Sequence, residues 1–249
     1  MTILEEHADL TQPGLPMRVH LYRPAKPGRY AGLLLYSEIY QETGPIKRAA
    51  LRLAGHGYIV AVPEIFHEHE PPGTVLAYDP IGTDKGNRYK YATALATYDA
   101  DARQVLAMLA GHAACSGRLG AIGWCLGGHL AFRAAMNPQV LATACFYATD
   151  LHADTLGAGK RSDSLARLSE LRGELTLVWG RQDPHIPDEG RTKIRAALEA
   201  AKVNFMWHEF NAVHAFMRDE GPRYDPALTA IGYQLALESF ERVLKGGTS

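Results

Sequence analysis

Apolar and polar residues follow two patterns along the chain, each typical of one kind of element. Continuous apolar runs at residues 31–36 (AGLLLY) and 58–62 (YIVAV) are typical of buried parallel strands. Between them, residues 45–57 begin at a proline and end at a glycine, which predicts a helix. These three segments form one βαβ unit. Residues 17–22 alternate and stop before Arg23-Pro24, which predicts an edge strand.

The remaining chain keeps alternating between predicted helices and strands. Apolar residues at spacings of three and four predict a long helix over residues 91–110. Further strands are predicted at 118–123, 141–148, 175–180 and 203–210, and further helices at 126–136, at 191–201 and from Asp225-Pro226 onward. We expect an α/β fold, with a mostly parallel doubly wound sheet, helices on both faces and one domain over residues 1–249.

Composition and charge narrow the classes of partner. A chain of 249 residues with 47% apolar residues can bury a core without disulfide or metal staples. Its 26 Lys and Arg nearly balance 27 Asp and Glu, so no basic field attracts nucleic acid or an anionic membrane. We therefore expect a small-molecule partner, no nucleic acid or membrane partner, and a monomer or small homo-oligomer.

The first residues, the length of the apolar runs and the number of cysteines indicate in which cellular compartment the protein is expected. Residues 1–10 are acidic and lack the basic and apolar regions of a signal peptide. No apolar run approaches the roughly 20 residues that a membrane-spanning helix needs. The three cysteines are an odd number without a disulfide framework, which suits a reducing compartment. These features predict a cytoplasmic protein.

The most informative motif is the pentapeptide Gly123-Trp-Cys125-Leu-Gly127, which lies between a predicted strand and a predicted helix. It is the G-x-S-x-G nucleophile elbow with cysteine in place of serine. The flanking glycines relieve collisions at a sharp turn, and the N–H groups at the start of the helix, Leu126 first, point at the thiolate and the developing oxyanion. Cys115 and Cys145 lack flanking glycines, so we expect them to be structural.

A cysteine nucleophile needs a general base, and the base needs an acceptor that holds its tautomer. Asp183 and His214 each follow a predicted strand, and they come after Cys125 in the order nucleophile, acid, histidine that α/β-hydrolases use. Taken alone, Asp183 could be a turn residue before a proline and His214 a surface histidine. His185, in the same loop as Asp183, is expected to be poorly placed to meet the cysteine.

These residues resemble the dienelactone hydrolase family of α/β-hydrolases over most of the chain. The segments that carry the resemblance are Ser37-Glu38-Ile39, the elbow with Gly128, Gly180-Arg-Gln-Asp183-Pro184, His214-Ala-Phe-Met-Arg218 and Arg223-Tyr-Asp-Pro226. The resemblance implies that Glu38 interacts with the cysteine in the resting enzyme and takes its proton when an anionic substrate binds. It also implies that the Ile39 amide joins the Leu126 amide in the oxyanion hole.

Family members that open dienelactones hold the substrate carboxylate with two arginines. Arg218 matches one of them, whereas Lys85 stands where the other is expected, and Arg88 substitutes if the loop is shifted. Lysine keeps the charge but loses the guanidinium fork, which puts the dienelactone substrate in doubt. Tyr89 and Phe216, together with Trp124 and Tyr147, are candidates to line an aromatic substrate pocket, although isolated aromatic residues are more often core.

The sequence gives little support for a metal site or a nucleotide-binding site. His67-Glu-His-Glu70 precedes Pro71-Pro-Gly73 and lies in a predicted loop, and no cluster nearby completes a four-ligand metal site. No phosphate-binding or dinucleotide-binding glycine loop is present. We expect neither a metal nor a cofactor.

The sequence therefore predicts a cysteine-dependent hydrolase of lactones or activated carboxylic esters, acting through Cys125, His214 and Asp183 and a thioester intermediate. One alternative keeps the same triad in a broad-specificity aryl esterase for neutral or other electrophilic esters. A second alternative is a non-catalytic ligand-binding homologue that retained the hydrolase fold.

Overall fold

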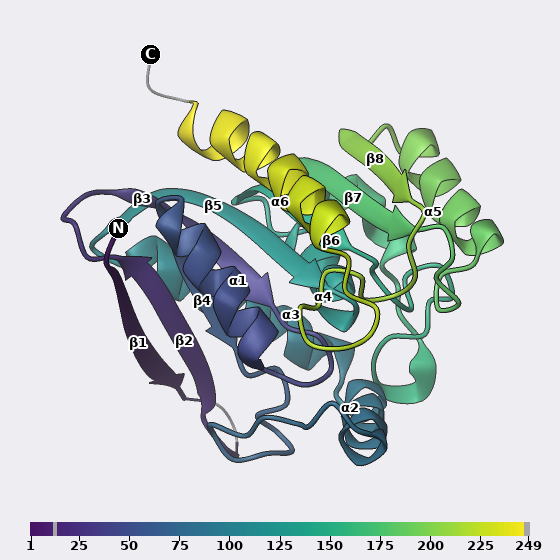
Figure 1. The fold of residues 1–249 in the computed structure, drawn as a ribbon, viewed down its shortest axis with the longest axis horizontal. Helices are drawn as coiled ribbons and strands as arrows, with labels where there is room; N and C mark the ends of the chain where they lie inside the picture. The colour runs from purple at the N-terminus through teal and green to yellow at the C-terminus, as the bar shows by residue number, and fades with distance from the viewer. Residues whose placement is uncertain (12–13, 247–249) are drawn as a thin grey trace.

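A computed structural model describes residues 1–11 and 14–246 of the chain. Its described residues contain one eight-stranded sheet with the strand order β1-β2-β4-β3-β5-β6-β7-β8 (Figure 1). The strands are β1 (Ile3–Leu10), β2 (Met17–Pro24), β3 (Tyr30–Tyr36), β4 (Tyr58–Pro63), β5 (Cys115–Trp124), β6 (Val140–Phe146), β7 (Glu174–Gly180) and β8 (Phe205–Phe210). Strands β3 to β8 run parallel to one another, and β1 and β2 form an antiparallel extension.

The continuous apolar runs became the strands at the centre of the sheet. Strands β4 and β7 are buried at every position, and β3 is buried at all but its first residue. Helices cover both faces and leave no solvated side to these strands, which is why their sequences do not alternate. The prediction of a mostly parallel sheet with helices on both faces is confirmed.

The prediction that residues 17–22 form an edge strand is wrong, because β1 pairs along the outer side of β2. Strand β1 is exposed at most positions, and the polar run Glu5-Glu6-His7 interrupts its apolar residues, so it gives no strand pattern in the sequence. Charge pairs across the two strands join them instead. Arg18 donates two hydrogen bonds of 2.8 Å to Asp9, its partner in the register, and Arg23 donates one of 2.6 Å to Glu6.

The helices form two layers around the sheet (Figure 1). Helices α1 and α6 pack on one face, against β2 and β4 and against β6 and β7 respectively, and α3 and α4 pack on the other, mainly against β3 and β5. The α-helices are α1 (Gly44–Gly55), α2 (Pro80–Ala92), α3 (Leu95–Gly111), α4 (Leu126–Ala134), α5 (Asp188–Ala200) and α6 (Pro226–Phe240). Three short helical turns are η1 (Ala158–Lys160), η2 (Leu165–Glu170) and η3 (Glu241–Lys245).

The predicted helix over residues 91–110 is confirmed as α3 from Leu95 onward, but residues 91 and 92 belong to the end of α2, a helix that the sequence did not predict. Thr93 and Ala94 separate the two helices. Both residues are extended, with ψ values of 131° and 147°. The carbonyl of Thr93 accepts a hydrogen bond of 2.9 Å from the N–H of Ala158, which a helical residue at this point could not provide. A contact with a segment distant in sequence therefore decides the break. The predicted C-terminal helix begins as expected, since the Asp225 carboxylate accepts the Leu228 N–H at 2.9 Å.

A buried arginine ties α4 to the loops on its face of the sheet. The Arg133 side chain is 3% exposed and donates two hydrogen bonds to Asp99, of 2.9 and 2.7 Å, and one of 2.6 Å to Asp163. It also bonds the Ser164 hydroxyl at 2.8 Å. Because the elbow cysteine immediately precedes α4, this network anchors the helix that positions the cysteine. Among the described residues, no helix has the length and apolar content to cross a membrane.

We predict that Arg133→Met lowers the free energy of unfolding by about 2 to 3 kcal/mol, because Asp99 and Asp163 lose their buried partner and keep only the more exposed Arg167. The value lies below that of a fully buried pair, since Asp163 is half exposed. Urea denaturation monitored by circular dichroism measures it. Arg167→Met is the matched control: Arg167 also pairs with Asp99 but is 30% exposed, so its loss should be under about 1 kcal/mol. Equal losses would contradict the anchoring role.

Candidate active site

The chain makes a strained turn where β5 ends and α4 begins. Cys125 occupies this turn with φ 58° and ψ −121°, a conformation that a non-glycine residue adopts only when its surroundings impose it. Its N–H donates a hydrogen bond of 3.0 Å to the carbonyl of Phe146, and its carbonyl accepts from Thr149 at 3.2 Å. The backbone thus has the form of a nucleophile elbow, with the thiol above the carboxyl edge of the sheet.

The glycines that flank the elbow are required by close contacts between backbones. A Cβ atom on Gly123 would overlap the carbonyl of Gly127, and one on Gly127 would overlap the carbonyls of Ser37 and Tyr36. Strand β5, helix α4 and the end of β3 therefore approach one another more closely than any side chain allows. This approach brings the start of α4, with its Leu126 amide, next to the segment Ser37–Ile39.

Asp183 and His214 meet at the same edge, after β7 and β8. His214 Nδ1 lies 2.6 Å from Asp183 Oδ2, and both side chains are buried. The second carboxylate oxygen of Asp183 accepts the backbone N–H of His185 at 2.8 Å. Both oxygens of the acid are thus fixed, and the acid holds His214 so that Nε2 is available for Cys125.

The electrostatics of His214 link it to the cysteine. Burial by itself lowers the pKa of this imidazole, but the charge of Cys125 and hydrogen bonds to Asp183 and Cys125 outweigh burial and raise the pKa to about 10. The protonated imidazole is thus favoured at neutral pH.

A buried carboxylate stands on the other side of the cysteine, at the end of β3. Glu38 is 4% exposed, and one of its oxygens lies 3.6 Å from an Arg218 guanidinium nitrogen. Burial raises the pKa of the Glu38 carboxyl, against the opposing charges of Arg218, His214 and Arg223. Proton uptake by Glu38 is therefore easier than by a solvated glutamate.

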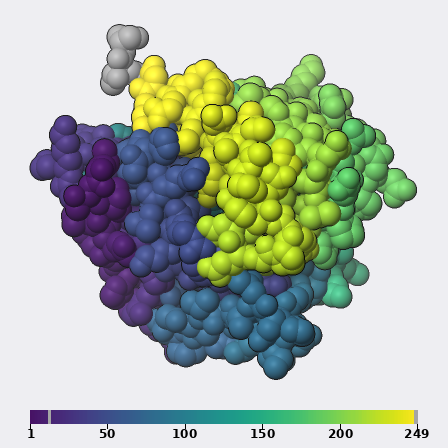
Figure 2. Space-filling model, viewed as in Figure 1, coloured from purple at the N-terminus to yellow at the C-terminus, as the bar shows by residue number. Residues whose placement is uncertain are grey.

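Arg218 is held by aromatic rings as well as by Glu38. Its guanidinium lies 4.4 Å from the centre of the Tyr78 ring and 5.8 Å from that of Tyr40. The loop that carries it continues to Asp219, which accepts two hydrogen bonds of 2.7 and 2.6 Å from Arg48 on α1. Figure 2 shows this loop lying against α1 on the visible face. The pair therefore fixes the loop between His214 and α6.

These groups surround a cavity of about 530 Å³ at the carboxyl edge of the sheet. Glu38, Cys125, His214 and Arg218 all line it, as does Ile39, whose amide was predicted to join the oxyanion hole. The remaining lining residues are Tyr40, Thr83, Asn87, Lys90, Tyr91, Thr149, Asp150, His152, Ala153, Pro184, His185, Ala215 and Arg223. The arrangement has the parts for acyl transfer: a nucleophile, a base with its orienting acid, and backbone donors.

A model of the dienelactone hydrolase family matches residues 17–244. The chain belongs to this family. A Saccharomyces cerevisiae protein that carries the provisional name carboxymethylenebutenolidase is 40% identical over 257 residues, 98% of this chain and 94% of that protein. The carboxymethylenebutenolidase of a Pseudomonas species is 26% identical over 234 residues, 92% of this chain and 91% of that protein. The protein is thus a carboxylic ester hydrolase of the dienelactone hydrolase family.

Solved structures share the fold. A Klebsiella pneumoniae protein, provisionally named a dienelactone hydrolase, superimposes with a TM-score of 0.83 at 23% identity and covers 97% of this chain and 100% of that chain. A dienelactone hydrolase-like promiscuous phosphotriesterase from metagenomic libraries superimposes with a TM-score of 0.78 at 18% identity, covering 97% and 98%. At these identities the likeness establishes the α/β-hydrolase fold.

Several residues that the sequence suggested for the dienelactone hydrolase pocket lie outside the cavity. Lys85 pairs with Glu70, and Tyr89 donates a hydrogen bond of 2.6 Å to the same carboxylate. The alternative cation, Arg88, is 67% exposed in its side chain and pairs with Asp84. None of these three predicted residues is among the lining residues, so α2 turns them away from the cysteine.

The predicted aromatic lining is part of the core. Phe216 is 1% exposed and packs edge-on against Tyr147, which in turn packs edge-on against His214 with ring centres 5.1 Å apart. Trp124 stacks on Phe146. Tyr147 thus packs against His214, and Phe216, Tyr147 and Trp124 are not among the residues that line the cavity.

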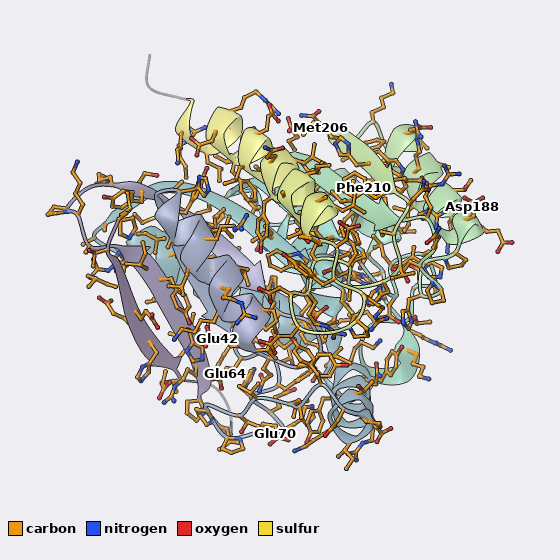
Figure 3. The ribbon with its side chains drawn as sticks, viewed as in Figure 1. Glu42, Glu64, Glu70, Asp188, Met206 and Phe210 are labelled. Carbon is orange, nitrogen blue, oxygen red and sulfur yellow. The ribbon has the colours of Figure 1, made fainter. Side chains whose placement is uncertain are left out.

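The two histidines of the motif at residues 67–70 make hydrogen bonds with different residues and do not converge on one point. His67 bonds Asp101 at 3.0 Å, and His69 bonds the Thr93 hydroxyl and stacks on Tyr89. Figure 3 labels Glu70 at the edge of the molecule beside α2. Within residues 1–11 and 14–246, no group of three or more histidine, cysteine or acidic side chains has the geometry of a metal site.

The other two cysteines are free and buried, at the start of β5 and within β6. Burial raises the pKa of the Cys145 thiol far above its usual range, so this sulfur stays protonated. Cys115 lies at the opposite end of β5 from the elbow. Neither lines the cavity.

Two features of the cavity escaped the sequence analysis. The ring of His185, expected to be poorly placed, lies edge-on against His214 with centres 4.6 Å apart and lines the cavity. Lys90 and Asp150 form a buried ion pair on the cavity wall. The presence of His185 two residues after Asp183 was a sequence signal for the histidine contact. No motif indicates the Lys90–Asp150 pair, because its two residues are 60 positions apart.

We predict that Gly127→Ala lowers kcat and the free energy of unfolding, by about 1 to 3 kcal/mol for the latter, because its methyl group overlaps the carbonyls of Ser37 and Tyr36. Gly55→Ala, at the end of α1 with open space around it, is the control and should leave both unchanged. Steady-state kinetics and urea denaturation measure the two effects. Similar behaviour of both variants would contradict the close approach.

We predict that Asp183→Asn lowers the pKa of His214 from about 10, since the carboxylate is one of the groups that raise it. The folded protein holds this proton more tightly than the unfolded chain. The stabilising contribution of His214 is therefore full below pH 6.5 and is lost as the pH rises towards 10. Imidazole NMR titration gives the midpoint, with His208 on β8 as an internal reference. An unchanged His214 midpoint would refute the coupling.

Proposed function

We propose that this dienelactone hydrolase family member is a cysteine-dependent hydrolase of lactones or activated carboxylic esters. The observation that carries the proposal is the 2.6 Å contact of His214 with Asp183 beside a cysteine on a strained elbow. The raised pKa of His214, caused partly by the charge of Cys125, supports an ion pair in the resting protein. The names of the relatives, carboxymethylenebutenolidases, support an ester or lactone substrate.

In the proposed first step, the Cys125 thiolate attacks the carbonyl carbon of the substrate. The amides of Leu126 and Ile39 donate hydrogen bonds to the oxyanion that develops. The tetrahedral adduct then collapses, the leaving oxygen takes the proton from His214, and a thioester remains on the cysteine. Asp183 stabilises the imidazolium and fixes its orientation throughout.

In the second step, neutral His214 takes a proton from a water molecule that attacks the thioester. The adduct expels the thiolate, and the carboxylic acid product is released with His214 protonated again. The resting ion pair is thereby regenerated. Glu38 takes the proton from any Cys125 that is present as the neutral thiol: it lies in the same cavity, and its raised pKa makes it a proton acceptor when Arg218 turns to a substrate carboxylate.

A second candidate function keeps the triad but takes neutral esters. The observation that favours it is the pairing of both buried cations of the cavity, Arg218 with Glu38 and Lys90 with Asp150. An anionic substrate must compete with Glu38 for Arg218, whereas a neutral ester need not. The exposed Arg223 at the cavity is the further cation that would favour an anionic substrate.

We predict that Cys125→Ala lowers kcat on 4-nitrophenyl acetate and on a butenolide carboxylate at least about a thousandfold, since the nucleophile is lost. Cys115→Ala, at the other end of β5, is the control and should retain activity. Arg218→Met should raise KM for the carboxylate substrate and spare the neutral ester. Full turnover by Cys125→Ala would refute the proposal, and a single stoichiometric acylation of the wild type without turnover would indicate a binding protein.

A further inference from the structure

The cavity has a polar wall that the proposed catalytic groups do not use. Lys90, from the last turn of α2, donates a hydrogen bond of 2.9 Å to Asp150, which follows β6. Their side chains are 8% and 9% exposed, and both residues line the cavity that holds Cys125. Burying an ion pair against a cavity carries a desolvation penalty that apolar residues of the same size avoid. Such a pair therefore calls for a specific reason.

The strand order places this wall beside the reacting sulfur. Strand β5, which ends immediately before Cys125, lies between β3 and β6 in the sheet. Glu38 follows β3 on one flank, and Thr149 and Asp150 follow β6 on the other. The Thr149 hydroxyl lies 4.0 Å from the Cys125 sulfur. A substrate whose carbonyl reaches the sulfur thus extends past Thr149 to the pair on this flank.

The pair is held rigidly by its neighbours. Asp150 adopts a left-handed conformation with φ 63°, and one of its oxygens accepts hydrogen bonds of 2.9 Å from the Tyr91 hydroxyl and 3.0 Å from Thr155. The Lys90 ammonium lies 4.3 Å from the centre of the Tyr91 ring. A strained backbone that is held in place by several hydrogen bonds, like that of Asp150, is typical of functional sites whose groups are preorganised.

The hydrogen-bonding capacity that remains defines what fits. A carboxylate offers about four acceptor positions, and Asp150 uses three of them for Lys90, Tyr91 and Thr155. A lysine ammonium has three donors, and Lys90 spends one on Asp150. Two donors of Lys90 and one acceptor position of Asp150 thus remain. An alcohol hydroxyl can use one of these donors together with the acceptor, whereas a carboxylate is repelled by Asp150 and an alkyl group makes no hydrogen bond with either charge.

From this geometry we infer that Lys90 and Asp150 form a hydroxyl-recognising subsite, which selects neutral hydroxylated lactones or esters. The inference rests on the proposed ester hydrolysis at Cys125 and adds the substrate class. Lys90 donates to the hydroxyl oxygen, and the hydroxyl donates to Asp150. Tyr91 and Thr155 act as positioning residues, since they hold the carboxylate and do not meet the substrate in this arrangement.

The test compares γ-butyrolactone with β-hydroxy-γ-butyrolactone, which differ by one hydroxyl. For the wild type we expect kcat/KM to be about 10 to 100 times higher for the hydroxylated lactone, the range for hydrogen bonds to charged groups. In Lys90→Met/Asp150→Asn this ratio should fall to near one, with γ-butyrolactone itself hydrolysed as before within about threefold. The double substitution removes both charges together, so neither is left unpaired, and asparagine tolerates the left-handed backbone.

Lys160→Met is the matched control. Lys160 also lies over the Tyr91 ring, 4.7 Å from its centre, but it does not line the cavity. This variant should keep the wild-type ratio. An equal fall on both lactones in the double variant would show that the pair only braces α2, and would overturn the inference. A wild-type preference for a carboxylated lactone that the double variant abolishes would make the wall an anion site and would overturn it as well.

A binding measurement separates this inference from the proposed catalysis. Calorimetry with 2-pyrrolidinone and 4-hydroxy-2-pyrrolidinone, unreactive amide analogues of the two lactones, reports recognition without turnover. We expect the hydroxylated lactam to bind at least about tenfold more tightly to the wild type and equally to the double variant. If the wild type hydrolyses neither lactone but keeps this binding preference, the proposed function fails and the subsite stands. Equal binding of both lactams to the wild type would overturn the subsite.

Discussion

The strained backbone of Cys125 is the constraint around which the site is arranged. With φ 58° the residue turns the chain abruptly from β5 into α4, and the turn exists only because Gly123 and Gly127 let three backbone segments touch. The same turn lifts the thiol above the sheet and directs the first amide of α4 towards it. The conformational strain is offset by the packing of β5 at the centre of the sheet and by the hydrogen bonds of α4 to its neighbours.

Charge at this edge is organised in pairs. The carboxyl ends of β3, β6, β7 and β8 deliver Glu38, Asp150, Asp183 and the loop of His214 to one cavity, and each acid has a cationic or imidazole partner there. Pairing lets several ionisable groups remain buried near one sulfur.

The sequence predicted the parallel core well and put Asp183 and His214 after neighbouring strands, where the structure brings them into contact, and it failed where long-range contacts decide the outcome. Strands buried on both faces have continuous apolar runs, and the elbow has a motif because its geometry forbids all but glycine at fixed positions. Strand β1 escaped because it is charged and held by cross-strand pairs. The break at Thr93 escaped because the apolar spacing runs across it, while a hydrogen bond from Ala158 fixes the extended backbone.

By itself, the sequence determined the type of fold and the glycine-flanked turn at Cys125, because local sterics and hydrophobic periodicity act over short stretches of chain. Only the tertiary structure decided which charges face the cysteine. Helix α2 turns Lys85 outward to Glu70 and Lys90 inward to Asp150, five residues apart on the same helix. That choice depends on the rotation of α2 against the loop after β6, and no local pattern of residues encodes such a rotation.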